Sequence, residues 1–226
     1  MKPYILEETD DFAVVFKPPR MHSEARAPLK QETDTLMHWY AEFFPRVTEQ
    51  GGLVQRLDYE TRGLLLIAKN RKSLEYFRAL QKRGGIIKEY GALTIASENP
   101  LSGFPPPPPL TDAPFSIESF FRPFGPGRKQ VRPVTDRMYR ELAKDQGGYY
   151  RTEIISIKDN LFTVRIKRGF RHQIRCHLAW IGRPILNDPL YGKVPPDNGA
   201  FLALSANALF FSDPTSSGRR EYRIGK

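Results

Sequence analysis

Hydrophobic and polar positions follow two different periods along the chain, and the period changes several times. The run FAVVFK at residues 12–17 is apolar and stops at a pair of prolines, which predicts a buried strand. The next segment, DTLMHWYAEFF, has large apolar residues at helical spacing and ends before Pro45. Its apolar stripe consists of Leu36, Trp39, Tyr40 and Phe43. We therefore expect an amphipathic helix with these residues in the core.

The stretch LVQRLDYETRGLLLIAK, residues 53–69, has charged residues at the start of an otherwise apolar strand. It is followed by NRKSLEYFRALQKRG, in which Asn70 is a suitable N-cap and Gly84 a suitable end for a helix. The buried face of this helix is predicted to hold Leu74, Phe77 and Leu80. A further strand, IIKEYGALTI, follows at residues 86–95.

Regular patterning stops between about residues 97 and 148, where Pro and Gly are frequent. Proline cannot donate the backbone hydrogen bonds of a helix or central strand, so this region is expected to be an irregular insertion or long loop. One interpretation is a rigid polyproline spacer at the surface. The other is a basic flap that closes over a polyanion, with cations at Arg122, Arg128, Lys129 and Arg132.

Order returns in YYRTEIISIKDNLFTVRIKR, where two alternating runs flank Asp159 and Asn160 and predict a hairpin. The segment RHQIRCHLAWIG at residues 171–182 predicts a helix. No internal repeat is present. The pattern indicates a mixed α+β fold, and 226 residues that are 40% hydrophobic are enough for one domain, residues 1–226, that contains the 97–148 insertion.

Charge points to a partner class. The chain has 35 Lys and Arg against 25 Asp and Glu, a formal net charge of +10, and a pI near 9.7. Such an excess favours contact with phosphates, so nucleic acid is the leading partner, with a merely solvated basic surface as the alternative. The single cysteine, Cys176, excludes an internal disulfide framework. Targeting and membrane-spanning patterns are not seen, so we expect a soluble cytoplasmic protein, monomeric by default.

The helix predicted at 171–182 has an unusual charge at its start. Arg171 and Arg175 lie four residues apart and are expected to share a face, flanked by His172 and Gln173 in the first turn. Cations at a helix N-terminus are unfavourable because the macrodipole is already positive there. An anion is therefore expected nearby, and the candidates are a bound phosphate or Asp58.

Three segments, QRLDYETRGLLLIAK, KEYGAL and HQIRCHLAWIGRPILNDPLYG, occur in this order and resemble the signature segments of the RluA-like RNA pseudouridine synthases. DDFAVVFKPPRM and LSANALFFSDP resemble the first and last strands of that family, so the resemblance covers most of the chain apart from the insertion. It implies a largely antiparallel sheet with flanking helices and a central catalytic cleft. It also implies conversion of uridine in RNA to pseudouridine without cofactor or metal. Ahead of YILEETDDFAVV, we expect no separate N-terminal RNA-binding module.

The resemblance also implies roles for individual residues. Asp58 would be the catalytic aspartate, Tyr90 would lie against the target base, and Arg175 would pair with the aspartate. Arg56 matches the position that enters the RNA helix as the base leaves it. The remaining RNA-facing candidates are Gln55, Thr61, Arg62, Arg171, His172, Gln173, Arg128, Lys129 and Arg132.

Some of these positions depart from the family pattern. Gln55 stands where histidine is common, Arg62 where serine is common, and GFRHQIR where GRTHQIR is usual, so that Phe170 and Arg171 replace arginine and threonine. These residues are expected to border the binding cleft. The RNA recognised is therefore expected to differ from that of better-known members, and both ribosomal and transfer RNA stay open.

The chemistry fits these residue types. Moving the glycosidic bond of uridine from N1 to C5 transfers no net electrons, so it needs an ionised carboxylate in a site with little water rather than a redox cofactor. A guanidinium such as Arg175 would oppose the rise in carboxylate pKa that burial causes. Whether Asp58 attacks the sugar, attacks the ring or removes a proton is left open by the sequence.

The sequence also allows three alternative interpretations. A non-catalytic RNA-binding protein on the same scaffold would keep the basic surface and would not need Asp58. A phosphate-handling enzyme is disfavoured because GPGRK lacks the spacing of a nucleotide-binding loop. A zinc site made of His172, Cys176 and His177 has helical spacing and lacks a fourth ligand nearby.

Overall fold

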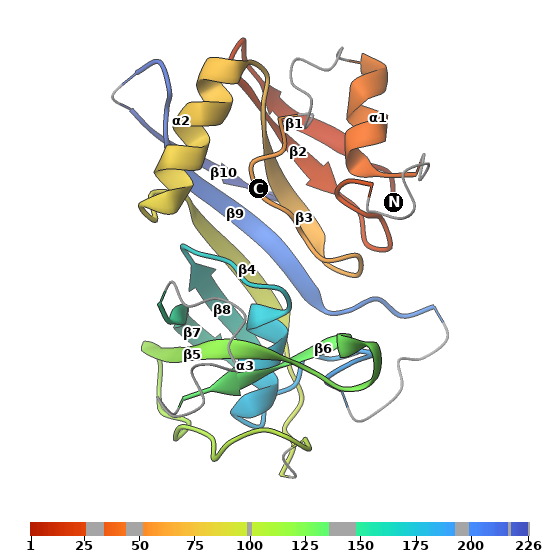
Figure 1. The fold of residues 1–226 in the computed structure, drawn as a ribbon, viewed down its shortest axis with the longest axis vertical. Coiled ribbons are helices and arrows are strands. Elements are labelled where there is room, and N and C mark those ends of the chain that lie inside the picture. The colour runs from red at the N-terminus through yellow and green to blue at the C-terminus, as the bar shows by residue number, and fades with distance from the viewer. Residues whose placement is uncertain are drawn as a thin grey trace. The chain divides into compact units, whose positions relative to one another are not determined.

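A computed structural model of the chain describes residues 1–25, 34–43, 52–98, 101–135, 148–192, 199–216 and 218–225. The chain divides into two compact units (Figure 1). Unit 1 consists of Met1–Lys88 and Ser205–Lys226, and unit 2 of Glu89–Leu204. In the described part of the chain, no helix is long and apolar enough to cross a membrane.

Unit 1 is built on a mixed sheet. Its elements are β1 (Tyr4–Glu8), β2 (Phe12–Lys17), α1 (Leu36–Phe43), β3 (Arg62–Ala68), α2 (Arg71–Lys82), β9 (Leu204–Ser212) and β10 (Arg219–Arg223). The strand order is β1-β2-β3-β9, with β10 paired to β9. The β1–β2, β2–β3 and β9–β10 pairs are antiparallel and the β3–β9 pair is parallel. The apolar run at 12–17 is thus a strand, as predicted, and all its residues are buried.

Helix α2 covers one face of this sheet because its sequence fixes both its start and its apolar side. The side chain of Asn70 accepts a hydrogen bond from the Ser73 amide, and the Ser73 side chain reaches back to the Asn70 amide, which forms a capping box. The predicted face of Leu74, Phe77 and Leu80 packs on residues of β2, β3 and β9. Figure 1 shows α2 lying along this sheet. Helix α1 also forms as predicted and buries Leu36 and Tyr40, whereas the side chain of Phe43 lies outside the described part.

The parallel contact between β3 and β9 depends on a glycine. Gly63 has a φ of +129°, and it pairs with Ala206. A Cβ at residue 63 would lie 2.4 Å from the carbonyl oxygen of Ala206 and 2.5 Å from its nitrogen. A side chain is therefore excluded here both by the backbone conformation and by the space available.

Unit 2 contains a second set of strands and one buried helix. Its elements are β4 (Ile87–Leu93, which begins at the end of unit 1), β5 (Phe115–Phe124), η1 (Pro126–Arg128), β6 (Gln130–Val134), β7 (Tyr150–Lys158), β8 (Leu161–Ile166) and α3 (Gln173–Trp180). The strand order is β4-β8-β7-β5-β6. The β5–β6, β5–β7 and β7–β8 pairs are antiparallel. The predicted hairpin is β7–β8, and Asp159 in its turn has a φ of +55°.

The prediction of an irregular region at 97–148 is wrong for residues 115–134, which form β5 and β6. The prolines are tolerated because of where they lie in the ladder. Pro123 lies in the half of β5 that pairs with β6 alone, since β7 pairs only with Phe115–Ser119. Pro133 lies in β6, the last strand of the order, where one side needs no donor. Residues 101–110, with their run of prolines, form neither helix nor strand, and residues 99–100 and 136–147 lie outside the described part.

The helix predicted at 171–182 is present as α3, but it begins at Gln173 with His172 as N-cap. Arg171 therefore precedes the helix, and the expectation that it shares a helical face with Arg175 is wrong. All residues of α3 are buried, so there is no exposed polar side. The polar residues of this helix must accordingly find hydrogen-bond partners in the interior.

Candidate active site

Asp58 lies in a loop of unit 1 that is fastened on both sides of it. On one side, the Ser23 hydroxyl accepts from the amide of Leu57 at 3.1 Å and donates to the carbonyl of Leu57 at 3.0 Å. On the other, the carbonyl of Tyr59 accepts from the amide of Arg20 at 2.8 Å. A turn closes the loop, because the Thr61 amide donates to the Asp58 carbonyl at 3.0 Å. The backbone that carries the half-buried Asp58 side chain is thus held in place before any substrate binds.

Lys17, the last residue of β2, lies beneath this loop and is fully buried. Its ammonium donates to the carbonyls of Pro18 at 2.9 Å, Met21 at 2.8 Å and Tyr59 at 3.3 Å. Burial lowers the pKa of Lys17 from 10.5 to about 7, against the opposing attraction of Asp58 and Glu60. The lysine therefore links the β2 turn to the Asp58 loop and places a titratable cation near the candidate catalytic carboxylate.

Two polar side chains next to Asp58 have unmet hydrogen-bonding groups. Gln55 is only 7% exposed, and within the described residues neither its Nε2 nor its Oε1 has a hydrogen-bond partner. The buried Thr61 hydroxyl is likewise without a partner in that part of the chain. A buried amide or hydroxyl without a partner is costly, by roughly 1–3 kcal/mol. A water or another polar group that reached these atoms would relieve that cost.

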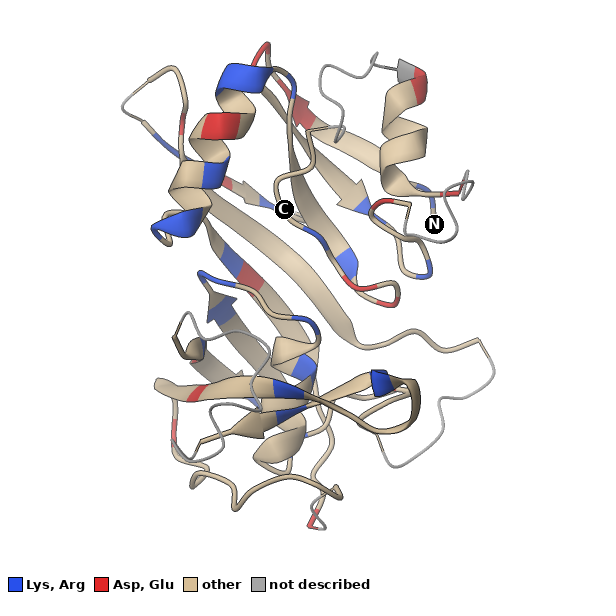
Figure 2. Cartoon of the chain, viewed as in Figure 1, with Lys and Arg blue, Asp and Glu red and all other residues tan. Residues whose placement is uncertain are grey.

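Both arginines that flank Asp58 in the sequence belong to unit 1. Arg56 is exposed and its Nη1 lies 3.0 Å from the Glu24 Oε1, which is the surface ion pair that competes with a role in RNA binding. Arg62 is the first residue of β3 and pairs with Ser205 of β9. Figure 2 shows that basic and acidic positions lie close together along the ribbon in the loops at this end of unit 1.

Tyr90, the residue expected to face the target base, lies in β4 of unit 2 and is buried. Its neighbour Glu89 accepts from Arg165 of β8 at 2.7 Å. Asp58 belongs to unit 1, whereas Tyr90 and Arg175 belong to unit 2. A common cleft for these residues, and a pair between Asp58 and Arg175, therefore stay predictions.

Arg175 has a carboxylate partner that the sequence reasoning missed. Its Nε and Nη2 donate to the two oxygens of Asp188 at 2.8 and 2.6 Å, and both side chains are buried. Asp188 Oδ1 also accepts from the amides of Leu190 and Tyr191. Asp188 is thus one anion near the start of this helix, and the predicted alternatives, a bound phosphate or Asp58, stay predictions. The available signal was the acidic residue in the apolar stretch PILNDPLYG.

The residues around the start of α3 are engaged in unit 2. The Arg171 Nη2 donates to the carbonyls of Arg128 at 2.6 Å and Gln130 at 3.2 Å. The His172 Nδ1 lies 3.3 Å from the hydroxyl of Tyr191. Gln173 is buried, and its amide is fully used by backbone groups and by Thr152. Of these residues Gln173 is a structural side chain rather than a phosphate ligand, while Arg171 is exposed and next to the β5–β6 turn.

The zinc site considered for His172, Cys176 and His177 is not formed. The two ring nitrogens of His177 lie 2.9 Å from the Ser119 hydroxyl and 2.8 Å from the Thr152 hydroxyl, and burial lowers the His177 pKa to about 3. The buried Cys176 thiol donates to a backbone carbonyl, and burial raises its pKa. Among the described residues, no group of His, Cys, Asp and Glu could hold a metal ion.

The basic flap expected around residue 130 separates into exposed and buried cations. Arg128 and Lys129 are exposed at the turn between β5 and β6. Arg132 is instead buried, with its guanidinium 4.4 Å from the ring centre of Phe104 and 4.1 Å from that of Phe124. The expectation that Arg132 contacts RNA is wrong in this structure, because its charge is enclosed by aromatic rings and carbonyls.

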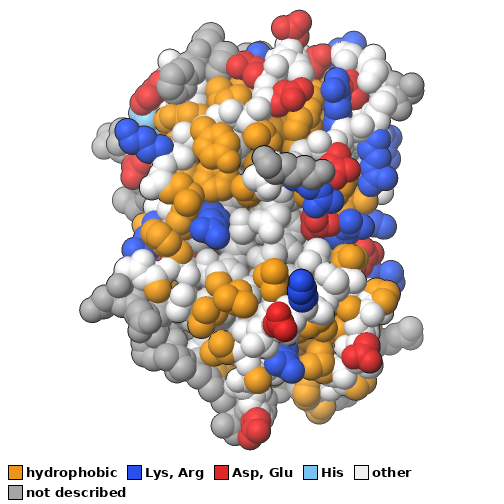
Figure 3. All heavy atoms as spheres, turned by 180° about the vertical axis from the view of Figure 1, so that it is seen from behind, with side chains coloured by type: hydrophobic (Ala, Val, Ile, Leu, Met, Phe, Trp, Pro, Cys, Tyr) orange, Lys and Arg blue, Asp and Glu red, His pale blue; other side chains and the backbone are white. Residues whose placement is uncertain are grey.

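The excess positive charge of the chain does not form a uniform basic patch on the face drawn in Figure 3. On the face drawn in Figure 3, Lys and Arg are interspersed with Asp and Glu and with apolar side chains. A mixed surface of this kind attracts a polyanion weakly. The exposed cations near Asp58 and at the β5–β6 turn are therefore the better candidates for phosphate contacts.

A family model described as RNA pseudouridylate synthase matches residues 11–180. The chain belongs to this family. Among curated proteins, it is 30% identical over 209 residues to the ribosomal large subunit pseudouridine synthase D of Haemophilus ducreyi, and the match covers 88% of this chain and 57% of the relative. It is 27% identical over 220 residues to synthase C of Rickettsia typhi, with 93% and 63% covered. The chain thus spans about three fifths of the length of these relatives.

The fold is also that of the family. The solved structure of human RNA pseudouridylate synthase domain containing 1 matches with a TM-score of 0.68 and 21% identity, covering all of this chain and 84% of that one. The corresponding human domain-containing 4 structure matches with a TM-score of 0.64 and 18% identity. The predicted α+β class with a mostly antiparallel sheet is therefore confirmed.

Proposed function

We propose that this chain is an RNA pseudouridine synthase that acts on ribosomal RNA, with Asp58 as its catalytic carboxylate. The observation that carries the proposal is the family match over residues 11–180, which includes Asp58, Tyr90 and Arg175. Ribosomal RNA is preferred to transfer RNA because the curated relatives described above are named as large ribosomal subunit synthases.

The reaction sets clear requirements for the site. In the uridine, the N1–C1′ bond breaks, the ring is turned, and a C5–C1′ bond forms. C5 loses its proton and N1 gains one, so atoms and electrons balance within the nucleotide and a proton exchanged with the surroundings. A fixed carboxylate close to the sugar or the ring can act as nucleophile or as base in this sequence.

The setting of Asp58 supports this role. Its loop is fixed by hydrogen bonds at Leu57 and Tyr59, so the carboxylate does not need to be ordered when the substrate arrives. The Lys17 ammonium is attracted by this carboxylate. A carboxylate that is preorganised in a partly buried loop is suited to chemistry that requires limited access of water.

Residues of unit 2 would supply the other requirements. A base inside an RNA helix must be extruded to reach a carboxylate, at a cost of a few kcal/mol, and an aromatic ring can hold it. Tyr90 is proposed as that ring. Arg175 is proposed to act at the site as a fixed cation, since Asp188 sets the orientation of its guanidinium.

The substrate is tested by mapping pseudouridine across total RNA from cells with and without this protein. We expect one or a few sites in large-subunit ribosomal RNA to disappear. The loss of sites only in transfer RNA would leave the activity standing and refute the choice of substrate.

The catalytic residue is tested by Asp58→Asn, which preserves size and removes the negative charge. We expect the rate of pseudouridine formation to fall by roughly a hundredfold to ten-thousandfold, which is the usual effect of losing a catalytic acid or base. RNA affinity should stay within a few-fold of the parent, because it rests on many phosphate contacts.

The matched control is Glu60→Gln, which removes a carboxylate from the same turn. The Glu60 carboxylate pairs only loosely with Arg20, at 3.8 Å. This variant should retain most of the activity. Melting curves on the same preparations verify that both variants are folded. An Asp58→Asn protein that is folded and isomerises uridine at the parental rate would overturn the proposal and favour a binding protein on the same scaffold.

A further inference from the structure

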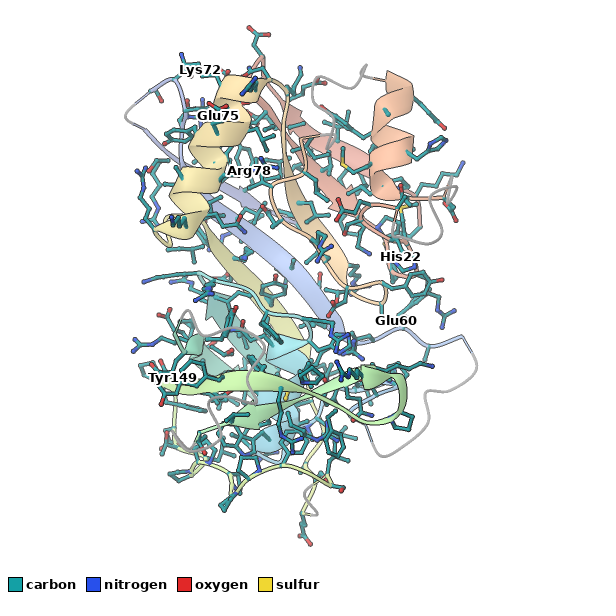
Figure 4. All side chains as sticks on the ribbon, viewed as in Figure 1. His22, Glu60, Lys72, Glu75, Arg78 and Tyr149 are labelled. Carbon is teal, nitrogen blue, oxygen red and sulfur yellow. The ribbon has the colours of Figure 1, made fainter. Side chains whose placement is uncertain are left out.

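Two aromatic rings meet beside Asp58 in unit 1. The rings of His22 and Tyr59 have their centroids 4.7 Å apart with 40° between their planes. Tyr59 directly follows Asp58 in the chain and is 42% exposed. Figure 4 labels His22 and Glu60, the residue after Tyr59, in the two loops at this end of unit 1. One ring contact thus leaves much of the Tyr59 surface open.

The loops that carry these rings are tied to each other. The Ser23 hydroxyl bridges to the backbone of Leu57, and the Tyr59 carbonyl accepts from both the Arg20 amide and the Lys17 ammonium. The His22 carbonyl in turn accepts from the amide of the first residue of α1. The backbones of His22 and Tyr59 are therefore ordered in advance, which reduces the entropy lost when a ligand stacks on a ring.

Two arginines lie close to these rings in the sequence. Arg20 lies two residues before His22 and pairs with Glu60 at 3.8 Å, and Arg56 lies three residues before Tyr59 and pairs with Glu24 at 3.0 Å. All of these side chains are partly exposed, so the ion pairs are weak and can exchange carboxylates for phosphates. An exposed ring flanked by exchangeable arginines is the arrangement that binds unpaired nucleotides, through stacking on the ring and charge on the backbone.

We infer that the His22–Tyr59 pair is a stacking platform for an unpaired nucleobase of the RNA, next to the uridine that is modified. This inference rests on the proposed function for the identity of the RNA as substrate. It assigns a role to two residues outside the proposed catalytic set and implies that the substrate is single-stranded beside the target. A duplex offers its bases already stacked and gains little from such a ring.

The test measures binding of two probes by fluorescence anisotropy at one salt concentration. The probes are a labelled twelve-nucleotide oligouridylate and a blunt RNA duplex of the same length. We expect Tyr59→Ala to weaken oligouridylate binding on the order of tenfold, the scale of one lost base–aromatic stack, and to leave duplex binding unchanged. Tyr59→Phe keeps the ring and should bind as the parent does.

A matched control is Tyr149→Ala in unit 2. Tyr149 is 46% exposed and also contacts a ring, that of Phe120, but it lies in the other unit (Figure 4). Its removal should leave oligouridylate binding as it is. Because Tyr59 is partly exposed, melting curves of all variants should agree closely with that of the parent.

Several outcomes decide the inference. Parental oligouridylate affinity in folded Tyr59→Ala would overturn it, and so would an equal loss for both probes, which indicates a general change in charge or fold. The proposed function fails separately, if the parent protein forms no pseudouridine in any RNA. In that case a selective loss of oligouridylate binding in Tyr59→Ala would still establish the platform.

Discussion

Buried polar side chains around α3 and around Asp58 differ in whether their hydrogen-bonding groups have partners among the described residues. Gln173, in α3, is 2% exposed and each of its amide groups is hydrogen-bonded. Gln55, near Asp58, is almost as buried, yet its amide has no hydrogen-bond partner within the described residues. A closed polar network specifies a structure, whereas an open one costs stability until a ligand completes it. The two glutamines therefore distinguish the framework of unit 2 from the proposed binding region of unit 1.

The largest expected effect on stability comes from breaking the buried ion pair between Arg175 of α3 and Asp188. Asp188→Leu leaves the Arg175 guanidinium buried without this carboxylate, and we expect the free energy of unfolding to fall by about 3–5 kcal/mol. Urea denaturation measures this change. Combining Asp188→Leu with Arg175→Met removes the unpaired charge and should recover much of the loss.

The double variant is the decisive control for that pair. A double variant no more stable than Asp188→Leu alone would show that the loop contacts of Asp188 to Leu190 and Tyr191, rather than its charge, hold this region together.

A second, pH-dependent effect is expected at Lys17. Its pKa is about 7 in the folded protein and 10.5 in its ordinary state, so between these values the unfolded chain binds more protons. The contribution of this residue to stability is therefore complete above about pH 10.5 and is lost as the pH falls toward 7. The slope is at most about 1.4 kcal/mol per pH unit.

Comparison with Lys17→Met isolates this slope from other groups, including Lys88, whose pKa is lowered to about 8 by burial. Guanidinium denaturation from pH 6.5 to 10 should show the parent gaining stability on the variant as the pH rises. Parallel curves would mean that Lys17 titrates near its ordinary value and that the Asp58 loop does not rest on a buried cation.

The smallest expected effect tests the two glutamines directly. Gln173→Met should lower the free energy of unfolding by roughly 1–3 kcal/mol, because it removes the hydrogen bonds of this side chain to Thr152 and to two backbone groups. Gln55→Met should change stability by less than about 1 kcal/mol, or increase it, since the Gln55 amide forms no hydrogen bond with the described residues. Thermal melts of both variants, with RNA affinity for Gln55→Met, measure the contrast. Equal losses of stability would show that Gln55 is as well bonded as Gln173.

The sequence predicted what local signals determine. The N-cap at Asn70, the apolar run at 12–17 and the turn at Asp159 each act within a few residues, and the structure has an element at each place. Strands β5 and β6 are not predicted from the sequence because proline usually interrupts a strand. Pro123 and Pro133 are tolerated because each lies where a neighbouring strand is absent on one side. Such positions depend on the whole sheet order.

At the candidate site, residue types were easier to predict than partners. Asp58 was found from its motif, but the Asp188 partner of Arg175 and the burial of Lys17 depend on chain segments that meet only after folding. Arg132 shows the same limit, because its charge within GRKQVRP resembled that of the exposed Arg128 and Lys129. Whether a cation faces solvent or an aromatic ring is decided by tertiary packing.

The close approach at Gly63 has a consequence for how this chain can vary in evolution. The aliphatic residues of β3 can exchange with one another, since cores tolerate swaps that conserve volume. Gly63 cannot, because any side chain would meet the backbone of Ala206. The glycine therefore fixes the register of β3 against β9. The number of residues between Gly63 and Asp58 then determines where the Asp58 backbone lies relative to this strand pair. Under the proposed function, an insertion or deletion between Asp58 and Gly63 would move the catalytic carboxylate while leaving the sheet intact, so we expect this spacing to be kept wherever the chemistry is kept.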